Sequence, residues 1–103
     1  MTNFSFNELI KCGNENYENR DYEGGIDDFS KAIEINPRKH EAYYNRGLAK
    51  KTIKDYSGAI SDYKKAIDIY PYYWEAFSNL GNLKNQSQIL NQEKDQMPVS
   101  KLR

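Results

Sequence analysis

Hydrophobic residues recur along this chain at the spacing of one helix face, and they do so twice in the same form. Between Glu23 and Ile35, apolar residues stand three, three and one positions apart, and a later segment repeats the arrangement. They are Ile26, Phe29, Ala32 and Ile33 in the first segment and Ile60, Tyr63, Ala66 and Ile67 in the second. Such a stripe is typical of an amphipathic helix that buries one side. With the neighbouring segments, the pattern predicts helices at about 6–19, 22–35, 40–53 and 56–69, and a fifth that begins near Trp74.

Each of the two segments has a start signal and a stop signal. Asp21 and Asp55 stand just before them, and an aspartate there can accept the backbone N–H groups that the first helical turn leaves unpaired. Pro37 and Pro71 follow the last apolar residues, and proline cannot continue a helix. The segments are therefore predicted to be separate helices joined by short turns.

The chain repeats itself at a fixed interval. Gly13, Gly47 and Gly81 are each 34 positions apart, and residues 21–37 are identical to residues 55–71 at ten of 17 positions. A fixed period of this length indicates stacked copies of one structural unit. Each unit contains two predicted helices, and the third copy loses the pattern after about residue 86.

The repeated glycine lies inside the first predicted helix of each unit, where glycine costs roughly 1 kcal/mol relative to alanine. Its recurrence at one point predicts that the paired helix approaches closely there, with the small residues Gly25 and Ala59 on the facing side. We expect the aromatic residues Phe29 and Tyr63 to project between successive units.

These positions resemble the signature of the tetratricopeptide repeat, a 34-residue helix–turn–helix unit. The matching residues are Gly13, Tyr22, Gly25, Phe29, Ala32 and Pro37 in the first unit and Gly47, Tyr56, Ala59, Tyr63, Ala66 and Pro71 in the second. The resemblance implies an all-α fold, a right-handed superhelical stack of antiparallel helix–turn–helix hairpins known as an α-solenoid. It divides the chain into a first repeat over 6–39, a second over 40–73 and a partial third repeat or capping helix over 74–97. We expect residues 98–103 to form a disordered tail.

The composition argues against several classes of function. The 103 residues carry 15 lysines and arginines against 15 aspartates and glutamates, so the chain lacks the positive charge of a nucleic-acid-binding domain. One cysteine and one histidine leave no material for a disulfide framework or a zinc site, and no nucleophile–base pair suggests an enzyme. No apolar run is long enough to span a membrane, and the N-terminal residues lack the features of a signal peptide. We expect a cytoplasmic protein that uses no cofactor or metal and binds neither nucleic acid nor membrane.

The resemblance also implies a binding surface. In this family the first helix of each repeat lines the concave wall of the stack, and that wall holds an extended peptide or a helix of a partner. The positions that face it here are Asn14, Tyr17, Tyr44, Asn45, Lys51, Asn79 and Asn82, together with Asn7 and Lys11. Asparagine offers both a donor and an acceptor to a peptide backbone. The hypothesis is a protein-interaction adaptor whose partner is another protein or a peptide.

The same resemblance disfavours one specific binding function. Family members that capture the C-terminal carboxylate of heat-shock chaperones use two asparagines and three basic residues. Asn14 and Asn45 match the asparagines, but Ile10, Glu75 and Asn79 stand at the basic positions. None of these three supplies the positive charge that pairs with a carboxylate, and Glu75 repels one.

The turn after the second repeat suggests a different function. It reads Tyr70-Pro71-Tyr72-Tyr73-Trp74, whereas the corresponding turn in the first repeat is polar and basic. Exposed aromatic residues at this point would form an apolar patch, and tyrosine and tryptophan are favoured in protein interfaces. The alternative hypothesis is therefore a structural self-association module, a homodimer that uses Tyr72, Tyr73, Trp74 and the weakly capped C-terminal end.

Overall fold

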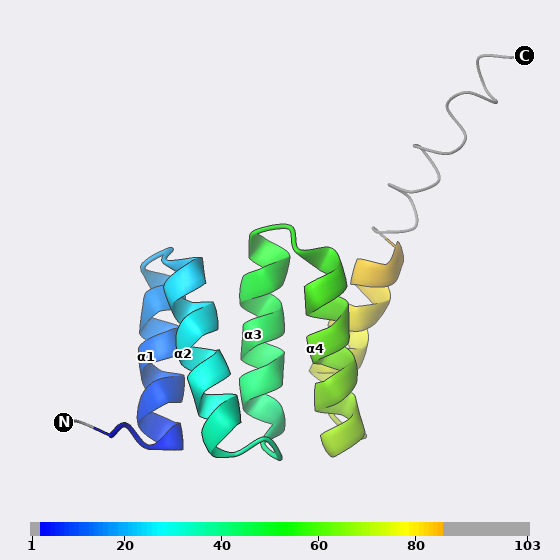
Figure 1. The fold of residues 1–103 in the computed structure, drawn as a ribbon. Helices are drawn as coiled ribbons and strands as arrows, with labels where there is room; N and C mark the ends of the chain where they lie inside the picture. Colours follow the sequence, from blue (N-terminus) through cyan, green and yellow to red (C-terminus); the bar gives the residue numbers. More distant parts are fainter. Residues whose placement is uncertain (1–2, 86–103) are drawn as a thin grey trace, which may run out of the picture.

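The computed structural model of the chain describes residues 3–85, which form five helices and no strand (Figure 1). They are α1 (Phe6–Glu18), α2 (Tyr22–Ile35), α3 (His40–Thr52), α4 (Tyr56–Ile69) and a fifth helix described over 74–85. The helices expected from the apolar pattern are confirmed, and the bounds of the first four agree to within one residue. The later part of the expected capping unit, 86–97, and the expected tail, 98–103, lie outside the described residues.

Side chains cap the N-terminal ends of three of these helices. Asp21 accepts the backbone N–H of Gly24 at 3.0 Å, and Asp55 accepts that of Gly58 at 3.1 Å, as the sequence predicted. A third cap was not foreseen: the Ser5 hydroxyl accepts the Glu8 N–H, and the Glu8 carboxylate accepts the Ser5 N–H. These two hydrogen bonds form a capping box, and the bond from the Ser5 backbone is the main reason why the pKa of Glu8 lies below its usual value.

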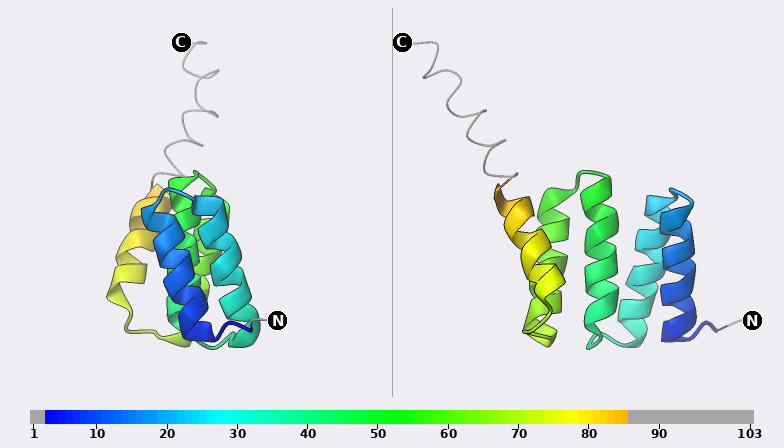
Figure 2. Two further views of the ribbon diagram at one scale, coloured as in Figure 1. Left: turned by 90° about the vertical axis from the view of Figure 1, so that its left-hand side faces the viewer. Right: turned by 180° about the vertical axis from the view of Figure 1, so that it is seen from behind.

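The helices pair as antiparallel hairpins that stack in chain order. α1 packs on α2, α3 packs on α4, and α2 packs on α3 to join the two hairpins. The fifth helix follows at the end of the stack beside α4 (Figure 2), where Leu80 and Leu83 form one buried cluster with Ala59 and Tyr63. The architecture is the all-α stack of helical hairpins that the sequence led us to expect.

An aromatic ring fills the space that each of the first two repeated glycines leaves open. A Cβ atom on Gly47 would lie 2.7 Å from a ring carbon of Tyr63, and one on Gly13 would overlap the ring of Phe29. Both rings are fully buried. Each ring enters the glycine notch of its own hairpin, which the sequence did not lead us to expect. Tyr63 also packs against the fifth helix, which belongs to the next unit, in agreement with the expectation that these rings project between units.

The described residues show neither a membrane-spanning helix nor a metal site. No helix among them is both long and apolar enough to cross a bilayer. In the same part of the chain, no three histidine, cysteine, aspartate or glutamate side chains stand close enough together to hold a metal ion.

Candidate functional site

Three polar side chains connect α3 to the fifth helix on the surface formed by the first helices of the hairpins. Lys51 donates from Nζ to Oδ1 of Asn79 at 3.2 Å, and Asn79 donates from Nδ2 to the hydroxyl oxygen of Tyr44 at 2.9 Å. Asn79 also donates to the backbone oxygen of Glu75 one turn earlier. Because Tyr44 accepts the Asn79 bond, its own hydroxyl proton stays available to a ligand.

Burial keeps that hydroxyl proton in place. The pKa of Tyr44 lies above its usual value, mainly because the phenol is withdrawn from water, and the nearby carboxylate of Glu75 adds to the shift. The hydrogen bond from Asn79 acts in the opposite direction. Tyr44 is therefore a neutral donor across the physiological pH range.

A second set of contacts connects α1 to α3 on the same surface. Asn45 donates from Nδ2 to Oδ1 of Asn14 at 3.3 Å. The Tyr17 hydroxyl lies 3.2 Å from the Thr52 hydroxyl, which itself donates to the backbone oxygen of Leu48. The amide nitrogen of Asn14 and the amide oxygen of Asn45 are left to bind a ligand.

The structure thus brings together six of the seven residues that the sequence assigned to a binding surface. We call the set of Asn14, Tyr17, Tyr44, Asn45, Lys51, Thr52 and Asn79 the first-helix network. Asn82 is exposed and, among residues 3–85, takes no part in these bonds. The sequence analysis did not identify Thr52. Its separation from Tyr17, 35 residues or one repeat plus one residue, is the sequence feature that could have indicated the contact.

The aromatic turn is only partly an exposed surface. Tyr72 is 84% exposed and Trp74 is 69% exposed, in agreement with the proposed patch. Tyr73 differs from the expectation: it is half-buried, with its ring centroid 4.8 Å from those of both His40 and Tyr44. Burial raises the pKa of Tyr73 to about 12. Phe77, which the sequence did not single out, is 50% exposed and extends the patch into the fifth helix.

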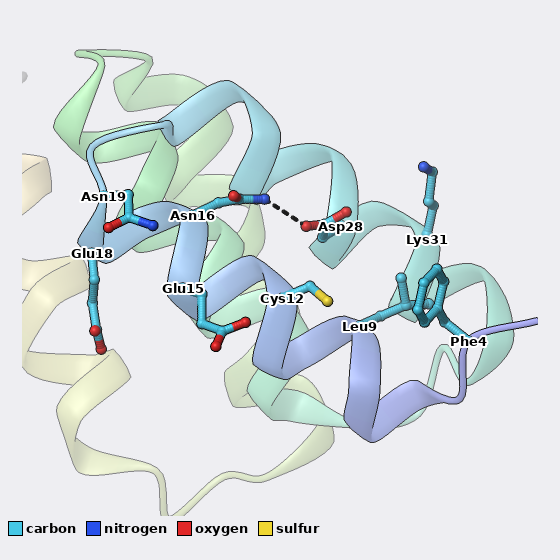
Figure 3. Close-up of a pocket in the computed structure, with 9 residues that line it drawn as sticks. All are labelled: Phe4, Leu9, Cys12, Glu15, Asn16, Glu18, Asn19, Asp28 and Lys31. Carbon is cyan, nitrogen blue, oxygen red and sulfur yellow. Dashed lines mark hydrogen bonds between the residues drawn. The ribbon is translucent and has the colours of Figure 1, made fainter. Parts of the chain in front are cut away.

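A pocket of about 770 Å³ lies between α1 and α2, away from the first-helix network (Figure 3). Asn16 of α1 points across it and donates to Oδ2 of Asp28 on α2 at 2.8 Å. The other lining residues are Phe4, Leu9, Cys12, Glu15, Glu18, Asn19 and Lys31.

The second hairpin has a smaller pocket, of about 410 Å³, at the corresponding place. Asp62 is the counterpart of Asp28 one repeat later, and its carboxylate receives Arg46 and Lys50, the counterparts of Cys12 and Asn16. The larger volume in the first hairpin agrees with the smaller side chain at residue 12, where the second hairpin has Arg46. It is a consequence of the repeat's variation and needs no ligand to explain it.

The sequence and the fold together define a class, the helical-hairpin solenoids, and the comparisons give the family. The model described as tetratricopeptide repeat matches residues 40–73, and one described as TPR repeat matches residues 13–53. The two matches overlap and together cover residues 13–73, which include Gly13, Gly47 and the aromatic residues Phe29 and Tyr63. The chain belongs to the tetratricopeptide repeat family.

Solved structures share the arrangement of the helices. The first tetratricopeptide domain of Spaghetti (RPAP3), bound to the HSP90 peptide SRMEEVD, is 26% identical, with a TM-score of 0.80 over 96% of this chain and 79% of that one. The tetratricopeptide domain of Arabidopsis OM64 is 21% identical, with a TM-score of 0.76 over 79% and 67%. MamA is 24% identical, with a TM-score of 0.81 over 88% and 53%. No curated protein matches the sequence.

Proposed function

We propose that this chain is an adaptor that binds an extended peptide or a helix of a partner protein on the first-helix network. The observation that carries the proposal is the bonding of Asn79 to Lys51 and Tyr44, which joins two successive first helices into one polar surface. The Spaghetti domain supports it, because that domain carries a peptide in a related fold.

The chemistry of the network favours recognition of a peptide backbone. Asn14 keeps a donor, Asn45 keeps an acceptor and Tyr44 keeps a hydroxyl proton. An extended peptide presents unpaired N–H and C=O groups, and these three positions can satisfy them. Tyr44 and Tyr17 add apolar contact area at a low cost in side-chain entropy.

Binding to a C-terminal carboxylate is a different mode, and the described charges do not favour it. Ile10, Glu75 and Asn79 occupy the positions at which carboxylate-binding relatives carry basic residues. Lys51 carries a positive charge but does not stand at one of these three positions. We therefore propose that the free carboxylate of a peptide contributes little to its affinity.

Calorimetry with peptides selected from a random library on the immobilised chain tests the binding surface. Asn45→Ala removes one neutral hydrogen bond to the ligand, and Asn79→Ala removes the bonds that hold Lys51 and Tyr44 in place. Each should raise the dissociation constant up to about tenfold, the upper range for one neutral hydrogen bond. Asp27→Ala, on the exposed side of α2, is the matched control and should leave affinity unchanged. Equal affinity in all variants would place the binding site elsewhere.

The peptide SRMEEVD, with a free and with an amidated C-terminus, tests the binding mode. The two forms should bind with affinities within about twofold of one another, because no cation stands at the three positions described above. A requirement for the free carboxylate would overturn the backbone-recognition mode and leave the adaptor function standing.

A self-association module is the second candidate function. The observation that favours it is the exposed aromatic surface at the end of the stack, which includes Tyr72, Trp74 and Phe77. A melting temperature that rises with protein concentration would support this function, since dimerisation stabilises the folded state by mass action.

A further inference from the structure

Among residues 3–85, no side chain fills the notch of the third repeated glycine, unlike those of the first two. In the first hairpin the ring of Phe29 lies against Gly13, and in the second the ring of Tyr63 lies against Gly47. A Cβ atom on Gly81 would find no atom of the described residues within 4 Å. The fifth helix therefore presents the docking site for an antiparallel helix with an aromatic residue, and no described helix occupies it.

The exposure of Phe77 indicates the same vacancy. Phe77 stands one repeat after Tyr43, which in turn stands one repeat after Leu9. Leu9 is 5% exposed and Tyr43 is 8% exposed, whereas Phe77 is 50% exposed. Leu9 and Tyr43 are covered by the second helix of their own hairpin and by the first helix of the next unit, and among the described residues Phe77 has neither. Half of a phenylalanine side chain left in water is a substantial loss of hydrophobic stabilisation.

The exposed residues on this side of the fifth helix form one stripe. Trp74, Phe77, Gly81 and Lys84 are separated by three, four and three positions, which is the spacing of a helix–helix seam. All four are exposed, while Ala76, Leu80 and Leu83 on the other side are buried against the stack. We call these four exposed residues the seam.

The chain's own later residues fit this seam poorly. In the register of the repeat, Glu93 falls at the position of Ala59 and Gly25. That position lies against the backbone of the first helix, since a Cβ on Gly25 would stand 3.1 Å from the carbonyl oxygen of Gly13. A glutamate at this point would prevent a helix from approaching the fifth helix as closely as α2 approaches α1. Pro98 follows directly after the residue that stands in the register of Phe29 and Tyr63, and proline interrupts a helix.

We propose that the seam binds the seam of a second copy of this chain, with the two fifth helices antiparallel about a two-fold axis at Asn79. In that arrangement Phe77 of each copy enters the Gly81 notch of the other. The pairing is self-complementary, as a two-fold interface requires. It repeats the antiparallel geometry by which Phe29 and Tyr63 fill the notches of their own hairpins.

The same axis places a cation over an aromatic ring. Residues 74 and 84 are both five positions from Asn79, so Trp74 of one copy lies opposite Lys84 of the other and can form a cation–π contact. The side chain of Asn79 points to the other side of the helix, where it bonds to Lys51 and Tyr44. The dimer therefore leaves the first-helix network open and does not depend on the proposed peptide-binding function; it rests on the self-association function proposed above and gives that function a defined interface.

Sedimentation equilibrium of the whole chain tests the interface. The wild-type chain should form a dimer, and both Gly81→Leu, which fills the notch, and Phe77→Ser should raise the dimer dissociation constant about tenfold or more. A side chain at residue 81 meets no atom of residues 3–85, so Gly81→Leu should leave the helices folded by circular dichroism. Tyr72→Ser separates the seam from an interface made by the aromatic turn: it should leave the dimer dissociation constant unchanged, because Tyr72 is exposed but lies outside the seam.

Disulfide formation tests the register independently. In a Cys12→Ser background, a mixture of Trp74→Cys and Lys84→Cys chains should cross-link to a mixed dimer. Each chain alone should not, because residues 74 of the two copies lie ten residues, about 15 Å, apart along the helix axis. A monomer at all concentrations, a dimer that survives Gly81→Leu, or cross-linking of the Trp74→Cys chain with itself would each overturn the proposal.

Discussion

The guanidinium group of Arg46 donates hydrogen bonds to both carboxylate oxygens of Asp62, from Nε to Oδ2 and from Nη2 to Oδ1, at 2.8 Å each. Lys50 approaches the same carboxylate at 3.3 Å, and Arg46 donates further to the Ser30 hydroxyl on α2. The Asp62 side chain is only 4% exposed. One arginine thus joins both helices of the second hairpin to the first hairpin, and its hydrogen bond to Asp62 raises its pKa.

Arg46→Met should lower the free energy of unfolding by about 3 kcal/mol, because it leaves a buried carboxylate with one lysine as its partner. Urea denaturation followed by circular dichroism measures the change. Asp62→Leu added to Arg46→Met should restore part of the loss, since an apolar pair needs no compensating charge. Equal stability of the single variant and the wild type would contradict a structural role for the pair.

Glycine to alanine should have opposite effects at Gly47 and Gly81. Gly47→Ala places a Cβ atom 2.7 Å from the Tyr63 ring, and such overpacking should cost about 1–3 kcal/mol. Gly81→Ala meets open space and should stabilise the fifth helix by up to about 1 kcal/mol. Thermal melts of dilute protein compare the two; a loss of stability in both variants would show that the Gly81 notch is filled.

Tyr63→Phe should leave the free energy of unfolding unchanged or raise it by up to about 1 kcal/mol. The Tyr63 hydroxyl is buried and has no hydrogen-bond partner among the described residues, so its removal relieves an uncompensated desolvation. Phenylalanine already stands at the equivalent position, Phe29. A clear loss of stability in the urea midpoint would mean that the hydroxyl has a partner.

Stability should fall as the pH rises above 10. Burial raises the pKa of Tyr73 from 10.0 to about 12 and also raises those of Tyr63 and Tyr44. Below pH 10 the folded and unfolded chains both keep these protons, and the full stability is present. Between about 10 and 12 the unfolded chain releases protons that the folded chain retains, so the free energy of unfolding decreases with pH.

Tyrosinate absorbance and helical circular dichroism, recorded together during an alkaline titration, measure this dependence. The buried tyrosines should ionise only as the helices are lost. Tyr73→Phe should reduce the alkaline loss of stability, because one retained proton no longer contributes. Complete ionisation of all tyrosines with the helices intact would contradict the burial of these phenols.

The candidate binding surface could be predicted as a set of positions but not as a set of contacts. The repeat register placed Asn14, Asn45 and Asn79 on first helices, because a side chain's position around a helix follows from its number. The bonds of Asn79 to Lys51 and Tyr44 join residues 28 and 35 positions apart. Such bonds depend on how closely and at what angle two helices pack, which no single segment encodes.

The sequence by itself determined the helices, their ends and their order, because caps, prolines and apolar spacing act within one segment or one repeat. It also determined the family, through glycines that recur at one fixed interval. Only the tertiary structure decided that Phe29 fills the notch of its own hairpin and that Tyr73 is half-buried beside the exposed Tyr72. It also decided that no residue within 3–85 fills the Gly81 notch. The physical reason is that the burial of a side chain depends on the residues that packing brings next to it. Two residues in the same local pattern can therefore have different neighbours and different exposure.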